Sequence, residues 1–527
     1  MTNSLAEIEN NDVLFVIGSN TKENHPIVAL RMIKAKRKGA KIIIADPRRV
    51  PMVRFADIWM QHKPGTDVAL LNGMMHVILK EGLIKKDFIS SMTEGFDDEF
   101  RKNIEAYTPE AASKITGVPA DTIIKAARMY GASEKAGIYY TMGITQHAHG
   151  TENVFSIANL ALMTGNLGKE SAGVNPLRGQ NNVQGATDMG CIPNMYPGYQ
   201  RVTIPAVQER FEALWKAKLS GKDGLTATEM LPAAGKGTLK ALYIMGENPA
   251  VSDPNTAHTV KALKALELLV VQDIFMTETA ELAHVVLPGS SFAEKVGTFT
   301  NTERRVQLVR RAVSSPGDAR KDSLIIMELS KRMGYEMSYP HTVEIFREMG
   351  QAWPALAGMS YARLEDGGLQ WPCPTPDHPG TQFLFKGGFP RGKGRFTPVT
   401  YKESAEQADK EYPFILTTGR LLFQYHTGSM TRRVKPINAV SPEAFIEINP
   451  NDARELSVSD GTMMKVSSRR GSITVKALVS KRPAPGVVFI PFHFKEAAAN
   501  VLTSSTSLDP IAKIPSFKVS AVRIEKA

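Results

Sequence analysis

Two stretches of the chain share one pattern of hydrophobic and polar positions. The first begins with VLFVI (13–17), continues through a helical pattern and reaches KIIIA (41–45). The second runs in the same way from ALYIM (241–245) to LELLVVQD (266–273). Short, uninterrupted apolar segments are typical of strands buried on both faces of a parallel sheet. The pattern therefore predicts two β–α–β regions.

The polar residues that follow these strands fall in the same register in both regions. Each first strand runs into Gly-x-Asn, and each second strand ends on an acid 28 positions (46 − 18) or 27 positions (273 − 246) beyond the glycine. Such a glycine lets the backbone approach a phosphate, and the acid can accept from a ribose or a guanine. Neither region carries GxGxxG, so an ordinary α/β domain is the alternative for each. Together they predict two nucleotide-binding halves, with Gly18, Asn20 and Asp46 in one and Gly246, Asn248 and Asp273 in the other.

Further helices and a β-rich segment complete the predicted α/β organisation. Helices are expected over 25–39, 67–82 and 118–131, where apolar residues recur at helical spacing and a glycine closes each pattern. Residues 463–480 instead alternate with a period of two across Gly471, which is typical of a hairpin. We expect α/β domains over 1–180 and 181–405 around one cleft, a linker over 403–413, and a β-barrel domain over 406–527.

Composition narrows the class of protein. The chain has 527 residues, a 43% hydrophobic fraction and a formal charge of +11. The charge suits an anionic ligand or an acidic partner, and no basic block alternates with aromatics, so no nucleic acid is expected. We expect no transmembrane segment, because no apolar run is long enough to span a bilayer. The two cysteines, Cys191 and Cys373, form no CxxC and suit a reducing, cytoplasmic compartment.

A loop rich in amides and glycines, NPLRGQNNVQGATDMG (175–190), holds one cation, Arg178. Glycines and amides favour turns and close approach of the backbone to a ligand. We interpret the loop as a binding surface for a large polar ligand. By contrast, His147 and His149 in QHAHG lack an evident third metal ligand, and we expect both to be solvated.

These motifs in this order resemble those of the molybdopterin oxidoreductases, and most of all those of the catalytic α subunit of metal-dependent formate dehydrogenases. The resemblance rests on the loop at 175–190, the paired Gly-x-Asn halves, MGITQ, MTGNLGK, QDIFMTETAELAHVVLP, GTFTNTERRVQ, HTGSMTRR and NVLTSSTSLDPIAKIPSFK, and it covers essentially the whole chain. It implies a barrel of the double-psi type and a molybdenum or tungsten ion held by two molybdopterin guanine dinucleotides, one for each half.

The resemblance also implies which residues hold this cofactor. One nucleotide would lie on Gly18, Asn20, Asn24, Asp46, Arg48, Gly65 and Asp67, and the other on Gly246, Glu247, Asn248, Gln272, Asp273 and Thr277. The pterin region would face Gly143, Gln146, Gln180 and Asn182. The C-terminal domain would add Gly419, Arg420, His426, Ser429, Asn500, Phe517 and Lys518. Two pyrophosphates need cations, so we expect Arg48, Arg420 and Lys518 to converge with the Arg178 loop.

Arg178 matches the active-site arginine of formate dehydrogenases. A guanidinium can bind a carboxylate through two parallel hydrogen bonds, so one side chain could both bind formate and aim its C–H bond. A contact with phosphate or pterin is the alternative role. The activity implied is oxidation of formate to CO2, or the reverse, with electrons passed to an iron–sulfur partner subunit such as a hydrogenase or an NAD-reducing module.

The sequence departs from the family at its start. Family members begin with a cysteine-rich domain that binds a [4Fe-4S] cluster and then present a cysteine or selenocysteine to the metal. Neither is here, so we expect the cluster in an upstream segment or a partner and expect this chain alone to be incomplete for catalysis. An in-frame selenocysteine codon read as a stop is the favoured explanation, and a naturally split subunit is the alternative.

Two other classes of function compete with formate oxidation. One is another molybdopterin reductase, acting on nitrate or on an S- or N-oxide. The other is a cofactor-free structural subunit that retains the fold. The Arg178 loop and HTGSMTRR favour formate over the first, and the intact Gly-x-Asn halves disfavour the second.

Overall fold

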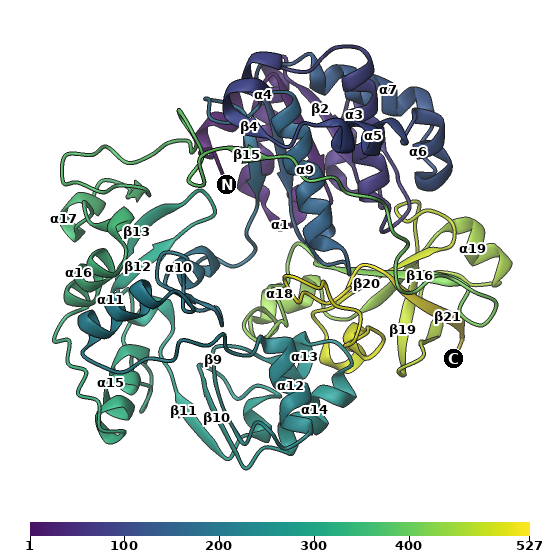
Figure 1. Ribbon diagram of the computed structural model, residues 1–527. Helices are drawn as coiled ribbons and strands as arrows, with labels where there is room; N and C mark the ends of the chain where they lie inside the picture. The colour runs from purple at the N-terminus through teal and green to yellow at the C-terminus, as the bar shows by residue number, and fades with distance from the viewer. The chain divides into compact units, whose positions relative to one another are not determined.

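The first β–α–β region forms a five-stranded parallel sheet in the computed structural model, which describes residues 1–527 (Figure 1). The strand order is β3-β2-β1-β5-β6, and each neighbouring pair is parallel. The strands are β1 (Val13–Ile17), β2 (Lys41–Ala45), β3 (Ile58–Met60), β5 (Ala136–Tyr140) and β6 (Gly173–Pro176). All five residues of β1 are buried, as expected for a central strand covered on both faces.

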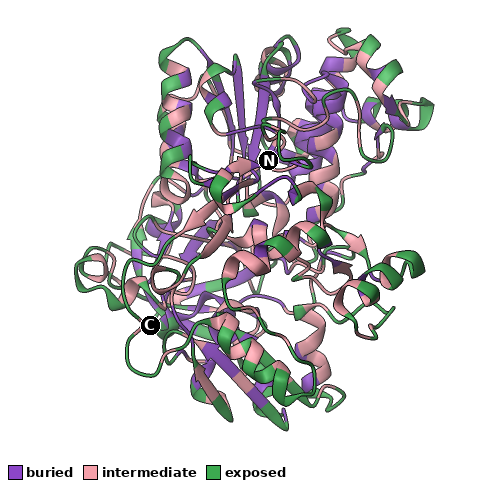
Figure 2. Ribbon diagram, turned by 90° about the vertical axis from the view of Figure 1, so that its left-hand side faces the viewer, coloured by how far each residue is buried: buried purple, intermediate pink, exposed green.

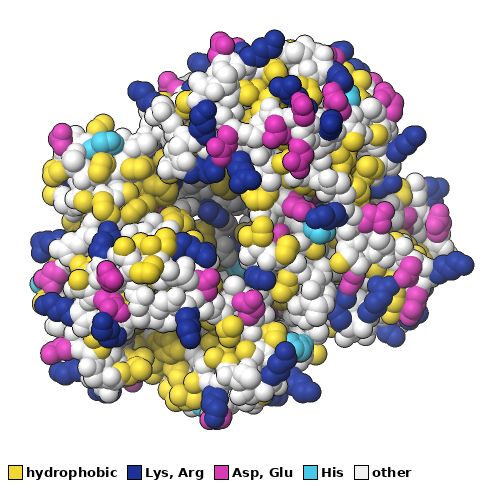
Figure 3. All heavy atoms as spheres, in the orientation of Figure 1, with side chains coloured by type: hydrophobic (Ala, Val, Ile, Leu, Met, Phe, Trp, Pro, Cys, Tyr) yellow, Lys and Arg dark blue, Asp and Glu magenta, His cyan; other side chains and the backbone are white.

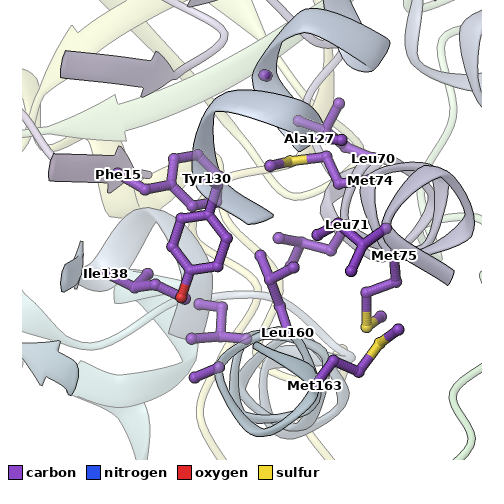
Figure 4. Packing of buried hydrophobic residues seen from close by; sticks show 14 of the residues in the cluster. Phe15, Leu70, Leu71, Met74, Met75, Ala127, Tyr130, Ile138, Leu160 and Met163 are labelled. Carbon is purple, nitrogen blue, oxygen red and sulfur yellow. The ribbon is translucent and has the colours of Figure 1, made fainter. Parts of the chain in front are cut away.

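The helices predicted around this sheet are confirmed as α2 (Pro26–Arg37), α3 (Asp67–Lys80) and α7 (Ala120–Gly131), and α9 (Gly150–Met163) joins them. Figure 4 shows part of this core, in which Phe15 and Ile138 from the strands and Met74, Leu160 and Met163 from the helices belong to one buried cluster. This packing fixes the carboxyl ends of the strands, where the predicted nucleotide contacts begin.

The second region repeats the design with three parallel strands, β9 (Ala241–Met245), β10 (Leu268–Asp273) and β11 (Val285–Pro288), in the order β11-β10-β9. Side chains such as Ile244 and Leu269 point into a core with α12 (Ala227–Gly235) and α14 (Thr256–Lys264). On β9, Tyr243 and Met245 are exposed on the opposite face. Figure 3 shows hydrophobic side chains gathered on the surface in the lower part of the view.

The two regions agree down to individual hydrogen bonds. The N–H of Gly18 donates to the carbonyl of Ala45 at 3.0 Å, and the N–H of Gly246 donates to that of Gln272 at 2.8 Å. Both glycines have positive φ, at +56° and +64°. Each acceptor precedes the predicted acid, so the same turn closes the same strand pair in both halves.

A second equivalence lies just before the third strand of each region, 11 positions (57 − 46 and 284 − 273) after the acid. Asp57 Oδ2 accepts the N–H of Ile42 at 2.8 Å. His284 Nδ1 accepts the N–H of Leu269 at 2.9 Å. Matching side-chain acceptors at matching positions support the reading of the two regions as a structural repeat.

The C-terminal part closes into a barrel in the order β16-β20-β17-β19-β18-β21. Its strands are β16 (Phe414–Gly419), β17 (Phe445–Ile448), β18 (Met463–Ser467), β19 (Ser472–Val479), β20 (Val487–Pro491) and β21 (Ser520–Lys526). The hairpin predicted around Gly471 is the antiparallel pair β18–β19. Alternate residues of β19 are buried and exposed, and Figure 2 shows buried strand segments inside the fold. The predicted α/β class with a β-barrel is confirmed.

Chain contacts divide the molecule into two compact units. Unit 1 comprises Met1–Leu177, Val251–Ala257 and Phe383–Ala527, and unit 2 comprises Arg178–Ala250 and His258–Gln382. The barrel and the first sheet therefore share unit 1, and the break falls just before Arg178. Within unit 1, Thr151 Oγ1 donates to Asp509 Oδ1 and the N–H of Arg49 donates to the carbonyl of Arg482, which tie the barrel region to the first α/β region.

The remaining elements are shorter or lie at the edges of these layers. The helices are α1 (Thr21–Asn24), α4 (Lys86–Met92), α5 (Asp98–Glu105), α6 (Pro109–Thr116), α8 (Met142–Thr145), α10 (Val183–Asp188), α11 (Pro205–Trp215), α13 (Pro249–Ser252), α15 (Asp322–Arg332), α16 (Thr342–Ala352), α17 (Tyr361–Leu364), α18 (Lys435–Val440) and α19 (Pro450–Glu455). The strands are β4 (Thr93–Glu94), β7 (Met195–Tyr196), β8 (Gln200–Arg201), β12 (Gly297–Thr300), β13 (Arg305–Val309), β14 (Leu369–Gln370) and β15 (Gly394–Arg395). None of the helices is long and apolar enough to cross a membrane.

Candidate cofactor and substrate sites

Unit 1 gathers cationic and imidazole side chains where the turn after β1, the loop after β16 and the loop after β20 meet. His25, His426 and His493 all lie within electrostatic reach of Arg420. Burial and the neighbouring guanidinium lower the pKa of each of these histidines to about 4. The three imidazoles are therefore neutral at pH 7, and the desolvated guanidinium of Arg420 is the positive charge among them that can attract an anion.

His493 has a defined role in shaping this group. Its Nε2 accepts the N–H of Leu421 at 2.8 Å, and its Nδ1 donates to the carbonyl of His426. The ring must therefore be neutral with its proton on Nδ1. His426 has a φ of +49°, so this bond helps to hold a backbone that L-residues rarely adopt. Sequence reasoning missed His493 because it lies in FHFK, outside the motifs that carried the resemblance.

Lys518 is the second cation of the group. Its Nζ donates to the carbonyl of Thr418 at 2.7 Å, and its backbone N–H donates to that of Gln146 at 3.3 Å. Burial, reinforced by Arg420, lowers the pKa of Lys518 to about 7, while Asp46 opposes the shift. Arg420 and Lys518 thus converge, as predicted for these two residues.

Arg48 lies close to this group, but its charge is already compensated. Its Nε donates to Glu447 Oε2 at 2.7 Å, and its guanidinium lies 3.5 Å from the centre of the Phe489 ring. Its backbone N–H donates to Asp46 Oδ1 at 2.9 Å. One buried atom, Nη2, has no partner in the protein. Because its charge is compensated by Glu447, Arg48 would contribute to a ligand mainly through one hydrogen-bond donor, Nη2.

A buried His62–Asp67–His147 cluster joins the segment after β3, the start of α3 and the segment after α8. His62 Nε2 is 3.1 Å from Asp67 Oδ1, and His147 Nε2 donates to the carbonyl of Gly143 at 2.8 Å. Asp67 holds the pKa of His62 above its usual value against the effect of burial. The expectation that His147 is solvated is wrong, because the tight turn 142–147 folds it inward; His149 stays partly exposed.

Close backbone approach accounts for several predicted glycines. A Cβ on Gly143 would lie 2.4 Å from the carbonyl oxygen of Gly18, and a Cβ on Gly65 would lie 2.3 Å from Ser404 Oγ. The N–H of Gly143 donates to Gly18 O at 3.1 Å. The turns that hold Gly18 and Gly143 therefore meet backbone to backbone, with no room for a side chain on Gly143, whereas Gly65 faces the side chain of Ser404.

The other predicted residues of unit 1 have mixed surroundings. Asn20 Oδ1 is buried without a partner, whereas Asn500 Nδ2 donates to the carbonyls of Val251 and Ser252. Asn24 ends α1, and Gly419 ends β16. Ser429 Oγ is 2.9 Å from Thr427 Oγ1, and the carbonyl of Phe517 accepts from Thr418 Oγ1 at 2.8 Å. Asn500 is used by the fold itself, and the orphaned oxygen of Asn20 is available to a ligand.

In unit 2, the predicted residues follow β9 and β10. Gly246 has a positive φ, and nothing lies within 4 Å of a Cβ built on it. Glycine is therefore favoured here by the backbone conformation and not by a lack of space. Asn248 Oδ1 accepts from the N–H and Oγ1 of Thr279, and its Nδ2 donates to Glu278 at 2.8 Å. Glu247 lies beside it in the same turn.

The acidic end of β10 is also occupied by local bonds. Gln272 Nε2 donates to Asp322 Oδ1 at 2.5 Å, and Asp273 Oδ1 accepts the N–H of Ile274 at 2.7 Å. Thr277 Oγ1 accepts the N–H of Ala280 at 3.2 Å. The second half therefore presents turns of the predicted kind, with many of their side-chain polar atoms engaged by the chain.

Arg178 opens unit 2 and is exposed, while its loop is anchored on both sides. Its backbone N–H donates to Thr302 Oγ1 at 3.0 Å, and its Nε donates to Gln184 Oε1 at 3.3 Å. Asn182 Oδ1 accepts the N–H of Thr300 at 2.9 Å. Gln180 lies partly exposed in the same loop.

A molybdopterin-type cofactor fits these residues. Unit 1 supplies desolvated cations beside turns that lack side chains, and it keeps buried polar atoms without partners at Asn20, Arg48, His62 and His147. A large ligand with phosphates and many hydrogen-bonding atoms would satisfy both features. The desolvated cations among these groups suit the phosphates of such a ligand.

Comparison with known proteins defines the class. Residues 1–332 match the family described as molybdopterin oxidoreductase, and residues 414–521 match the Molydopterin dinucleotide binding domain. The chain belongs to the molybdopterin oxidoreductase family.

Two relatives and one solved structure illustrate the similarity. The F420-dependent formate dehydrogenase subunit alpha of Methanocaldococcus jannaschii is 53% identical over 530 residues, which cover 100% of this chain and 78% of the relative. Formate dehydrogenase H of Escherichia coli is 44% identical over 100% of this chain and 74% of its own length. Acetylene hydratase from Pelobacter acetylenicus has the same fold, with a TM-score of 0.79 at 21% identity, over 99% of this chain and 81% of that one.

Proposed function

We propose that this chain is the catalytic subunit, or the larger part of it, of a molybdenum- or tungsten-dependent formate dehydrogenase. The observation that carries the proposal is identity of 53% over the whole chain to a subunit named for that activity. The reaction is oxidation of formate to CO2, which releases two electrons and one proton. When bound, the metal–pterin cofactor supplies the redox chemistry by taking up the two electrons.

The residues of this chain would bind and orient the reactants. In unit 1, Arg420, Lys518 and the orphaned Nη2 of Arg48 would hold the phosphates of one guanine dinucleotide, and the Gly18–Gly143 contact would let it approach the backbone. In unit 2, the turn from Gly246 to Asn248 and the end of β10 would hold the other. The remaining predicted cofactor contacts are proposed in the same roles.

Arg178 is proposed to bind formate. Its guanidinium is exposed at the start of a well-anchored loop, and a fork of two N–H groups matches a carboxylate. Bound in this way, formate would present its C–H bond in one direction only. In this role Arg178 orients the substrate and takes no part in proton transfer.

The alternative activities have less support. A nitrate or S- or N-oxide reductase would use the same cofactor, but the assimilatory nitrate reductase catalytic subunit of Bacillus subtilis is 37% identical over 99% of this chain, below the 53% and 44% of the two formate dehydrogenases. A cofactor-free structural subunit would have no use for the desolvated cations and orphaned polar atoms of unit 1. Turnover of nitrate or of an S- or N-oxide would favour the first alternative, and a purified protein without bound cofactor would favour the second.

The electron exit belongs to other parts of the assembly. We propose that electrons leave through iron–sulfur centres, including a [4Fe-4S] cluster outside the 527 residues described, to an electron-transfer partner subunit. The unpaired Cys191 and Cys373 suit the reducing conditions of the cytoplasm, where we place the enzyme.

The test is Arg178→Lys in the enzyme purified with its cofactor and partners. Lysine keeps the charge but loses the fork, so formate would bind in many orientations. Misplacing a reacting bond by about an ångström can cost on the order of a hundredfold in rate. We expect formate turnover to fall by about that factor while the metal and pterin contents stay near the wild-type level. Loss of cofactor together with activity would instead make Arg178 a cofactor anchor.

A further inference from the structure

The side chain of Arg178 is held from behind by a chain of buried polar groups. Gln184 Oε1 accepts from Arg178 Nε at 3.3 Å, and Gln184 Nε2 donates to Asp188 Oδ1 at 2.8 Å. Gln184 is 5% exposed and Asp188 is 1% exposed. Both lie on α10 at positions i and i+4, which places them on one face of that helix.

Asp188 is in turn fixed by two aromatic residues. Tyr199 OH donates to Asp188 Oδ1 at 2.7 Å and also accepts from Gln184 Nε2 at 3.0 Å. Trp371 Nε1 donates to Asp188 Oδ2 at 2.8 Å. Tyr199 has a φ of +62°, a conformation that a tyrosine adopts only when its surroundings hold it there.

The polarity of this chain follows from the chemistry of its last member. Burial raises the pKa of Asp188, but its carboxylate is surrounded by donors, because Tyr199 OH and Trp371 Nε1 both donate to it, and the amide Nε2 of Gln184 is a third donor. The amide then has only its oxygen left for Arg178. Asp188 therefore sets the orientation of the Gln184 amide. In this orientation the amide oxygen faces Arg178 and accepts from it.

This bond selects one edge of the guanidinium. Arg178 can form two hydrogen bonds to a carboxylate in two ways. It can bind side-on, through Nε and one terminal nitrogen, or end-on, through Nη1 and Nη2. Because Nε is committed to Gln184, the side-on edge is taken. The end-on edge remains for an external anion, and the arginine cannot rotate about its last bonds without losing the contact.

We propose that Gln184, oriented by Asp188, is a positioning residue that commits Arg178 to end-on binding of the substrate carboxylate. This inference rests on the proposed function of Arg178 in formate binding. Gln184 touches neither substrate nor cofactor in this role, and it acts only through the guanidinium. Tyr199 and Trp371 contribute by keeping the Asp188 carboxylate in place.

The test compares Gln184→Met with a matched control in the same unit. Methionine keeps the length and helix propensity of glutamine but removes both ends of the relay. Gln370 is also a buried glutamine, and its Oε1 accepts from an arginine, Arg305, at 3.3 Å, while its Nε2 donates to a carbonyl. Gln370→Met therefore removes an equivalent pair of bonds beside Trp371 but leaves the bonds of Gln184 in place, so it controls for a general disturbance of this part of unit 2.

In the holoenzyme, we expect Gln184→Met to raise the KM for formate about tenfold or more, as for loss of one hydrogen bond to a charged group. The kcat should fall as well, because a swinging guanidinium binds formate in unproductive orientations, while metal and pterin contents stay unchanged. Gln370→Met should leave both constants within about twofold of wild type. An unchanged KM in Gln184→Met, or an equal rise in Gln370→Met, would overturn the proposal.

A second measurement does not depend on turnover. Hydrogen exchange of the Arg178 Nε–H, assigned by its disappearance in Arg178→Lys, should be slow in the wild type and fast in Gln184→Met. Asp188→Asn, which keeps the shape but can turn the amide around, should also speed it. Equal exchange in all three proteins would refute the relay. If the wild-type holoenzyme fails to oxidise formate, the proposed function fails, whereas the exchange result still decides the relay.

Discussion

At the residue scale, the anion-binding group of unit 1 is held in a state that is costly without its ligand. Lys518 shares a desolvated volume with Arg420, and its pKa is lowered to about 7 from 10.5. Between these pH values the unfolded chain binds a proton that the folded chain does not. The free energy of unfolding of the cofactor-free protein should therefore increase as pH rises from about 7 to 10.5. Below pH 7, Lys518 is charged in both states, and the buried charge destabilises the fold to its full extent.

Substituting Lys518 separates stability from cofactor binding. We expect Lys518→Met to raise the free energy of unfolding of the cofactor-free chain at pH 7, with a gain that shrinks toward pH 10, as measured by denaturant unfolding. The same variant should retain cofactor about tenfold less well, because a hydrogen bond to a charged group contributes about 1.5–3 kcal/mol. Exposed Lys465 on β18 provides the control, and Lys465→Met should change neither property. Full cofactor retention by Lys518→Met would rule out its proposed contact.

At the element scale, the turns after β1 and β5 meet without side chains between them. Gly18 lies at the end of β1, and Gly143 lies in α8, which follows β5. Thr141 Oγ1 and the N–H of Gly143 both donate to the carbonyl of Gly18. This contact joins adjacent parallel strands at the edge where the nucleotide contacts are proposed.

We expect Gly143→Ala to destabilise the chain by about 1–3 kcal/mol, the usual range for overpacking, since its Cβ would lie 2.4 Å from Gly18 O. Cofactor content should fall in parallel. The control is Gly297→Ala, where nothing lies within 4 Å of the added Cβ and φ is not positive. Denaturant unfolding of both variants checks this, and equal stabilities would show that the backbone contact is looser than the structure has it.

At the scale of the whole molecule, local sequence patterns predicted the elements better than their assembly. The repeat, the helices that close on Gly39 and Gly82, and the β18–β19 hairpin follow from periodicity and turn residues, which act over a few positions. The sharing of unit 1 by the first sheet and the barrel could not be predicted in this way. It depends on contacts such as Arg482 with Glu23, which lie 459 positions apart and leave no local pattern.

The same limit applies to the site. Arg178 and the Gly-x-Asn turns stand out because unusual residues cluster in a short segment. His493 does not, since its role depends on Arg420 and on the carbonyl of His426, which lie about seventy positions earlier in the chain. Chemistry assembled from distant segments is visible only in the fold.

The most direct test of the account is formate-dependent reduction of an artificial electron acceptor by the purified holoenzyme, normalised to its molybdenum or tungsten content. We expect reduction in proportion to the metal, with CO2 formed in a one-to-one ratio to the electron pairs transferred. Nitrate and S- or N-oxides should not be turned over. A preparation that is fully loaded with metal and guanine dinucleotide but does not oxidise formate would contradict the central claim.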